Sequence, residues 1–114
     1  MGENKNFNYI TNEIENNEIV LFMKGTAQFP QCGFSSMVVA ILKKLGVKFQ
    51  DINVLAQLDL REDIKTFSDW PTIPQLYIKG EFVGGCDIVR TMHENGDLVL
   101  LLKSKNITMN PEAD

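Results

Sequence analysis

The feature that most constrains the fold is a pair of predicted strands joined by a helix. Residues 19–24 begin with an uninterrupted apolar run, which is typical of a buried strand. Residues 47–54 alternate loosely between apolar and polar side chains and are bounded by turn formers, which predicts a second strand. Between them, a helix is predicted to start near Ser36 and end at Gly46, with an apolar face made of Met37, Val38, Ile41, Leu42 and Leu45. A strand, a helix and a strand in this order predict a crossover connection and hence a parallel pair.

The remaining predicted elements complete a mixed sheet. Apolar residues at helical spacing predict one helix over residues 7–16 and another that must end before Trp70-Pro71, because the residue before a proline avoids helical geometry. Two short strands flank the turn pair Lys79-Gly80, which predicts an antiparallel hairpin. Two helices follow, the first with Asp87 as its N-cap and the second restarting at Gly96-Asp97. The sequence therefore predicts an α/β fold with a central mixed four-stranded sheet flanked by helices.

Length and composition predict a single domain of ordinary globular type. The chain has 114 residues, 44% of them hydrophobic and 23% charged, and its net charge of -4 gives no reason to expect a nucleic-acid partner. No run is apolar enough to predict a membrane span, so no membrane partner is expected. Two widely separated cysteines favour a reducing compartment, with the bacterial cytoplasm as the first expectation and an organelle matrix as the alternative. We expect the domain to cover residues 1–108 and the polar residues 109–114 to form a loose tail.

Cys32 lies at the junction between the first predicted strand and the helix that follows it, and we interpret it as a reactive thiol. The unpaired N–H groups and the dipole at a helix N-terminus favour an anion, and the thiolate is the form that attacks disulfides and binds metal. A two-cysteine oxidoreductase carries its second thiol three positions later, but that position holds Ser35. Cys32 is then left with thiol exchange on another molecule or with donating one sulfur ligand to a soft metal centre.

Other cofactor sites are not expected from the sequence. A zinc site would need more ligands than Cys32, Cys86 and His93 supply, and their spacing matches no zinc motif. The glycines near residues 80–85 do not follow a strand and open a helix in the pattern of a dinucleotide loop. We therefore expect neither flavin nor nicotinamide.

Four separated motifs resemble those of the monothiol glutaredoxins. They are Lys24 in Phe22-Met23-Lys24-Gly25, then Cys32-Gly33-Phe34-Ser35, Trp70-Pro71-Thr72-Ile73-Pro74 and Gly84-Gly85-Cys86-Asp87. The motifs stand in the order of that family, and the resemblance covers about residues 7–107. It implies a thioredoxin fold, with Cys32 as the catalytic thiol.

The resemblance also implies a glutathione site to which three cations contribute. Lys24 would stabilise the Cys32 thiolate or pair with a ligand carboxylate. Arg61 matches a residue that binds the glycine carboxylate of glutathione, and Lys65 shares its helix face. Without the resemblance, Arg61 and Lys65 would be interpreted as a solvated cationic face balanced by neighbouring acids. Trp70 stays open between core packing and contact with a ligand or partner.

Backbone groups would complete that glutathione site. A cis peptide bond before Pro74 would expose the backbone of Ile73, with Thr72 beside it, for pairing with the ligand. The helix that begins near Cys86 would receive the γ-glutamyl carboxylate on its N–H groups, while the Asp87 carboxylate accepts the ligand's amino group. Cys86 itself stays open between a spectator and a resolving thiol for Cys32. The implied glutathione-binding residues are Lys24, Cys32, Arg61, Lys65, Thr72, Ile73, Pro74, Cys86 and Asp87.

Two functions of different class would use this pocket. In the first, two chains each contribute Cys32, and two bound glutathione molecules complete the ligands of a bridging [2Fe–2S] cluster. This cluster-bridged homodimer would store clusters and pass them to iron–sulfur recipient or helper proteins. In the second, Cys32 is the nucleophile of a glutathione-dependent thiol-disulfide oxidoreductase that removes glutathione from proteins. The loop over residues 26–31 is longer than a short Pro-x-Cys segment before the cysteine. It resembles the loop of the cluster-carrying branch of the family, which favours the carrier.

Overall fold

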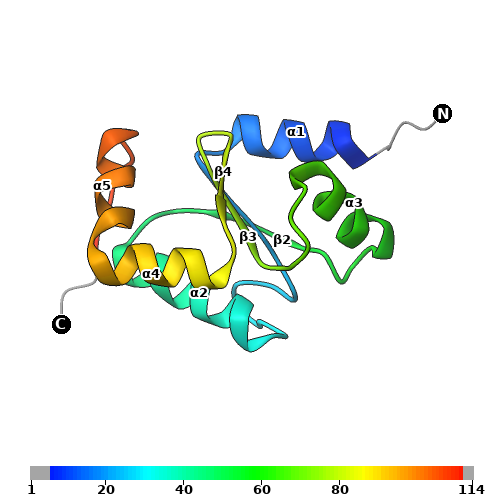
Figure 1. Ribbon diagram of the computed structural model, residues 1–114, viewed down its shortest axis with the longest axis horizontal. Helices are drawn as coiled ribbons and strands as arrows, with labels where there is room; N and C mark the ends of the chain where they lie inside the picture. Colours follow the sequence, from blue (N-terminus) through cyan, green and yellow to red (C-terminus); the bar gives the residue numbers. More distant parts are fainter. Residues whose placement is uncertain (1–5, 112–114) are drawn as a thin grey trace.

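The computed structural model describes residues 6–111, which form helices on both faces of one sheet (Figure 1). In chain order the elements are α1 (Asn6–Asn16), β1 (Ile19–Met23), α2 (Gly33–Leu45), β2 (Gln50–Asn53), α3 (Leu58–Ser68), β3 (Gln75–Ile78), β4 (Glu81–Gly84), α4 (Cys86–Asn95) and α5 (Asp97–Ser104). The strand order is β2-β1-β3-β4, with β1 parallel to β2 and antiparallel to β3, and β3 antiparallel to β4. The predicted mixed four-stranded sheet and its flanking helices are confirmed.

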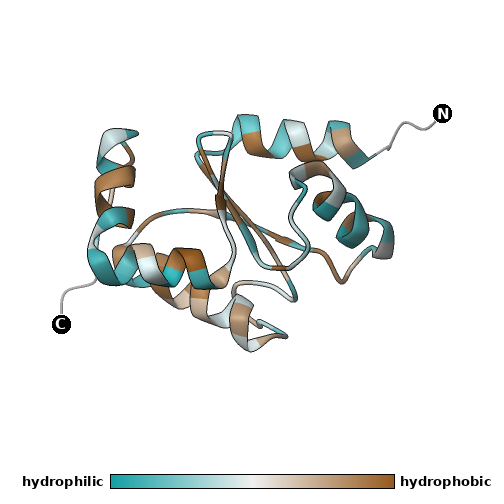
Figure 2. Cartoon of the chain, in the orientation of Figure 1, coloured by the Kyte–Doolittle hydropathy of each residue, from teal (hydrophilic) through white to brown (hydrophobic). Residues whose placement is uncertain are grey.

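The apolar run of β1 is explained by burial on both faces of the sheet. Side chains alternate along a strand, so Ile19 and Leu21 pack with α2, α4 and α5, whereas Val20 and Phe22 pack with α1 and α3. All five residues of β1 are buried. Figure 2 shows the apolar colouring concentrated along the sheet and on the helix surfaces that face it. Each face of the sheet therefore has its own apolar cluster.

Helix α2 begins earlier than predicted. Its first residue is Gly33 rather than a residue near Ser36, and Cys32 holds the N-cap position with an extended backbone. The first turn gave no apolar signal because Phe34 is exposed and Ser35 is buried, the reverse of an apolar stripe. Met37 was assigned to the buried face but is 39% exposed. The predicted end is confirmed, since Gly46 has a φ of 71° and its N–H bonds to carbonyl oxygens of the last turn.

Two other boundaries differ from their predictions. Strand β2 covers only Gln50–Asn53, because Val47 is used by the end of α2, where its N–H donates to the Leu42 carbonyl at 3.3 Å. The N-cap of α4 is Gly85 and not Asp87, so that prediction was wrong. The extended backbone of Gly85 already supplies the helix start, which leaves Asp87 inside the first turn with its carboxylate exposed.

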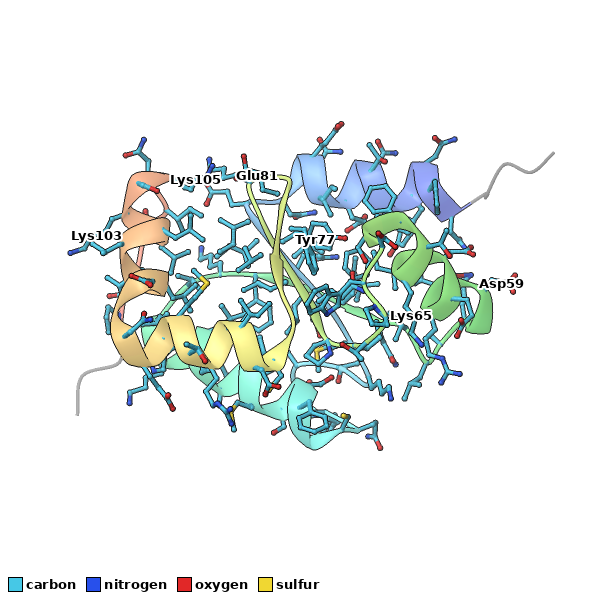
Figure 3. The ribbon with its side chains drawn as sticks, viewed as in Figure 1. Asp59, Lys65, Tyr77, Glu81, Lys103 and Lys105 are labelled. Carbon is cyan, nitrogen blue, oxygen red and sulfur yellow. The ribbon has the colours of Figure 1, made fainter. Side chains whose placement is uncertain are left out.

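The C-terminal segment packs on the domain as far as residue 110. Ile107 is buried, Met109 packs against the cluster around α2, and the Asn110 N–H donates to the Gly46 carbonyl at 2.9 Å. Lys105, just after α5, forms an ion pair of 3.1 Å with Glu81 of β4. Both residues are labelled near the top of Figure 3. The predicted boundary between residues 108 and 109 stays a prediction, and residues 112–114 lie outside the described residues. Within residues 6–111, no helix combines the length and the apolar character that crossing a membrane requires.

Candidate functional site

A pocket of about 580 Å³ brings the predicted site residues together. Its wall is built by the chain after β1, the start of α2, one face of α3, the loop before β3 and the start of α4. All nine residues of the predicted glutathione site line it: Lys24, Cys32, Arg61, Lys65, Thr72, Ile73, Pro74, Cys86 and Asp87. Segments that are up to about sixty positions apart in sequence therefore share one cavity, while the role of each residue stays a prediction.

Cys32 stands at the N-terminus of α2 with its thiol partly exposed. The N–H of Ser35, directed at the sulfur, is the main cause that lowers the pKa of the Cys32 thiol, and the N–H of Phe34 and the charge of Lys24 act in the same direction. Partial burial opposes them but does not reverse the shift. The lowered pKa increases the thiolate fraction of Cys32 at a position that a second molecule can reach.

Ser35 has a structural role that the sequence did not reveal. Its side chain is fully buried, and its Oγ accepts a hydrogen bond from the Lys24 N–H at 3.1 Å. This bond joins the end of β1 to the first turn of α2. Lys24 and Cys32, eight residues apart, are thereby fixed on the same side of the pocket.

The loop between β1 and α2 is held by side chains of the neighbouring strand β2. Gly25 and Pro30 form an isolated bridge, which closes the loop on itself. The Gly25 N–H donates to Asn53 Oδ1 at 2.9 Å, and the Ala27 N–H donates to Asp51 Oδ2 at 2.7 Å. Sequence reasoning missed Asp51 and Asn53, and the available signal was two polar residues at the end of a strand that runs parallel to β1.

The loop before β3 forms the opposite wall. The peptide bond between Ile73 and Pro74 is cis, as predicted. Trp70 lines the pocket and also packs against Phe82, with ring centroids 5.5 Å apart. Its position is therefore compatible with both core packing and contact with a ligand. A Cβ on Gly85 would lie 3.2 Å from the Pro74 carbonyl oxygen and from Trp70 Nε1. The start of α4 therefore rests directly on this loop.

Three cations and one carboxylate set the charge of the pocket. Lys24, Arg61 and Lys65 line it together with Asp87, although the chain as a whole carries a net charge of -4. Glu62 lies 3.6 Å from the Arg61 Nε and 3.7 Å from the Lys65 Nζ, as the alternative interpretation of a cationic face balanced by neighbouring acids would have it. Exposed pairs at such distances are weak, so both cations stay available to a ligand. The pocket suits a ligand with more than one carboxylate and a single ammonium group.

Cys86 shares the pocket with Cys32, but the pKa of its thiol is shifted in the opposite direction. Burial is the main cause that raises the pKa of Cys86, and the charge of Asp87 adds to it while Arg90 opposes. A thiol that stays protonated is a poor attacking group, which favours the spectator interpretation of Cys86. Both cysteines are free, and among residues 6–111 no three or more His, Cys, Asp or Glu side chains converge as metal ligands. A metal centre on Cys32 would need ligands from other molecules.

Comparisons with known proteins place the chain in a family. The glutaredoxin family model matches residues 19–83. A probable monothiol glutaredoxin 2 of Rickettsia conorii is 64% identical over 104 residues, which cover 91% of this chain and 97% of the relative.

Solved structures share the fold. A monomeric truncated mutant of 1-C-Grx1 from Trypanosoma brucei has a TM-score of 0.83 and 43% identity, covering 90% of this chain and 94% of that one. A buckwheat glutaredoxin solved as a complex with glutathione has a TM-score of 0.78 and 26% identity, covering 90% and 91%. The predicted thioredoxin fold is confirmed by these neighbours. The chain belongs to the glutaredoxin family, in its monothiol branch.

Proposed function

We propose that this protein binds glutathione in the pocket and carries a [2Fe–2S] cluster between two copies of the chain, for storage and delivery to recipient proteins. The observation that carries the proposal is that Cys32, a thiol of lowered pKa, lines one pocket together with the cations Lys24, Arg61 and Lys65. Such a site suits the binding of a thiol tripeptide, and the proposal takes Cys32 as the one sulfur ligand that the chain gives to a metal. A protein of this kind needs borrowed ligands to hold a cluster.

In this proposal, as the family resemblance implies, each end of glutathione binds to a different segment of the pocket wall. The glycine carboxylate pairs with Arg61, with Lys65 one turn away on the same helix. The central part of the tripeptide pairs with the backbone of Ile73. The γ-glutamyl carboxylate lies on the N–H groups that open α4, and its ammonium group meets Asp87. A neighbour of the same fold was solved as a glutathione complex, which supports glutathione as the ligand.

In this proposal the cluster is cargo, and dimerisation depends on it. Each chain donates the Cys32 sulfur, and each bound glutathione donates its own, which gives two sulfur ligands for each iron. Glutathione is held without a covalent bond, so its departure opens the cluster to a recipient or helper protein. Without cargo the chain is expected to be a monomer.

A second candidate function, thiol-disulfide exchange, is favoured by the lowered pKa of Cys32. The Cys32 thiolate would attack the glutathione sulfur of a mixed disulfide, and the target protein would leave as its thiolate. A second glutathione thiolate would then attack the new Cys32 disulfide, which releases glutathione disulfide and regenerates the thiolate. The carrier is preferred because the long loop before Cys32 resembles that of the cluster-carrying branch of the family, which implies that glutathione is shifted away from efficient attack on Cys32.

Anaerobic reconstitution with iron, sulfide and glutathione tests the proposal. We expect a brown dimer, read by its visible spectrum and solution mass, that does not form when glutathione is omitted. Cys32→Ser is expected to abolish cluster binding, whereas Cys86→Ser keeps most of it. Full cluster loading of the Cys32 variant at normal dimer mass would refute the ligand assignment. A colourless monomer that reduces glutathione mixed disulfides would instead favour the exchange reaction.

We further propose that the protein works in a reducing compartment, the bacterial cytoplasm. Both cysteines are free, and several of the similar proteins come from bacteria. Rapid alkylation of cells followed by mass analysis of the protein tests this assignment. Recovery of Cys32 mainly as an unreacted disulfide would contradict it.

A further inference from the structure

Gln75 is a fully buried amide behind the loop that forms one wall of the pocket. It is the first residue of β3 and follows Pro74 directly. Its Nε2 donates to the carbonyl oxygens of Trp70 and Thr72, both at 3.2 Å. Its Oε1 accepts a bond from the Tyr77 hydroxyl at 3.4 Å, so each end of the amide has partners.

The chemistry of these partners fixes which way the amide points. The carbonyls of Trp70 and Thr72 only accept hydrogen bonds, so the NH₂ end must face them. Burial raises the pKa of Tyr77 to about 12, against a smaller lowering by Ser68, so its hydroxyl keeps the proton that it donates to the other end. Figure 3 shows Tyr77 at the centre of the molecule, among side chains that fill the space between the sheet and the α1 and α3 helices. The amide is therefore locked between the core and the loop.

This bond pattern determines the direction of the Ile73 backbone. Among the described residues, the only cis peptide bond is the one between Ile73 and Pro74, so the bond between Thr72 and Ile73 is trans. In a trans peptide the C=O and the N–H point in opposite directions. When Gln75 holds the Thr72 carbonyl in the interior, the Ile73 N–H is turned to the opposite side.

The burial of Ile73 agrees with that direction. Ile73 as a whole residue is only 6% exposed; it packs in the cluster on the α1 and α3 side and also lines the pocket. The Ile73 side chain is used in that cluster, which leaves the backbone of the residue for contact with a ligand. We propose that Gln75 is a positioning residue for glutathione, which holds the Trp70–Pro74 loop so that the Ile73 N–H is presented to the ligand. This inference rests on the proposed glutathione site.

Titration of ¹⁵N-labelled protein with reduced glutathione, followed by the Ile73 amide signal, tests this role. Gln75→Met keeps the length and burial of the side chain but removes the NH₂ donor. We expect the dissociation constant to rise about tenfold, which corresponds to losing roughly one hydrogen bond between the protein and glutathione. We also expect the change in the Ile73 amide chemical shift on binding to become smaller. The pKa of the Cys32 thiol should not change, because its causes lie at the start of α2 and in Lys24.

Tyr77→Phe is the matched control. It removes one buried hydrogen bond from the same network but leaves the donors to both loop carbonyls in place. We expect it to lower the melting temperature while glutathione affinity stays within about twofold of the wild type. A loss of affinity equal to that of Gln75→Met would mean general softening of the core and would overturn the positioning role.

The remaining outcomes separate this inference from the proposed function. If the wild-type protein does not bind glutathione, the glutathione proposal fails, and the role of Gln75 fails with it. If Gln75→Met binds glutathione like the wild type with an unchanged Ile73 shift, only the positioning role is overturned. Should that variant not fold, the Gln75 side-chain NH₂ signals of the wild type decide. They are expected to follow the same titration curve as Ile73, and their failure to shift overturns the inference.

Discussion

Gly85→Ala is expected to weaken glutathione binding by crowding the contact between α4 and the loop before β3. The new Cβ would lie 3.2 Å from both the Pro74 carbonyl oxygen and Trp70 Nε1, and 3.8 Å from Thr72 Oγ1. The φ of Gly85 is -95°, so the backbone tolerates alanine and the effect comes from crowding alone. Crowding of this kind costs about 1–3 kcal/mol, and it is relieved when the loop moves away from α4.

That movement separates two parts of the proposed ligand site, the Ile73 backbone and the N–H groups at the start of α4. Because 1.4 kcal/mol corresponds to a factor of ten, we expect the dissociation constant for reduced glutathione to rise about tenfold. Gly33→Ala is the control, because a Cβ there meets no heavy atom within 4 Å and Gly33 does not line the pocket. Isothermal titration calorimetry on both variants checks the prediction. Equal affinities for Gly85→Ala and the wild type, or an equal loss in Gly33→Ala, would refute the crowding argument.

Three further predictions concern reactivity, packing and charge. The pKa of Cys32 is lowered while that of Cys86 is raised, so Cys32 should begin to react with iodoacetamide at a lower pH than Cys86 does. Identical pH profiles of alkylation for the two cysteines, measured by peptide mass spectrometry, would contradict this. Gly46→Ala should destabilise the protein by about 3 kcal/mol or more in urea unfolding, because a Cβ would overlap the Asn110 carbonyl in addition to straining a φ of 71°. Gly96→Ala, with a φ of 87° and no atom within 4 Å, should lose only about 1–2 kcal/mol, and equal losses would argue against packing of the C-terminal segment. Affinity for glutathione should fall as sodium chloride is raised, since three cations line the pocket, and an affinity independent of salt would contradict that reasoning.

The sequence predicted the architecture because strand β1 and the crossover helix carry strong periodic signals. Nine residues that line the pocket were predicted together because the chain resembles a known family, through four motifs and through the match of Arg61 on the third predicted helix. Local starts were harder, as at α2 and α4, where Cys32 and Gly85 hold the N-cap positions without any side-chain cap bond. Such caps carry no signal in composition, so Asp87 was the more conventional choice for a cap.

The supporting residues could not be predicted from spacing. Ser35 acts through a bond to the Lys24 backbone, and Gln75 acts through two carbonyls of the preceding loop. Asp51 bonds to a loop that lies far from it in sequence. These contacts exist only after the sheet has brought the segments together, so a linear pattern of residue types does not contain them.

The dispersed origin of the pocket wall links ligand supply to the lifetime of the fold. Its segments come from the chain after β1 and from α3, the loop before β3 and the start of α4, so unfolding any of them removes part of the cavity. A ligand that binds only the native chain stabilises it by an amount that grows with the logarithm of its concentration, about 1.4 kcal/mol for each tenfold excess over the dissociation constant. Depletion of the tripeptide in a cell would then shorten the survival of this protein against proteolysis, in addition to emptying its site.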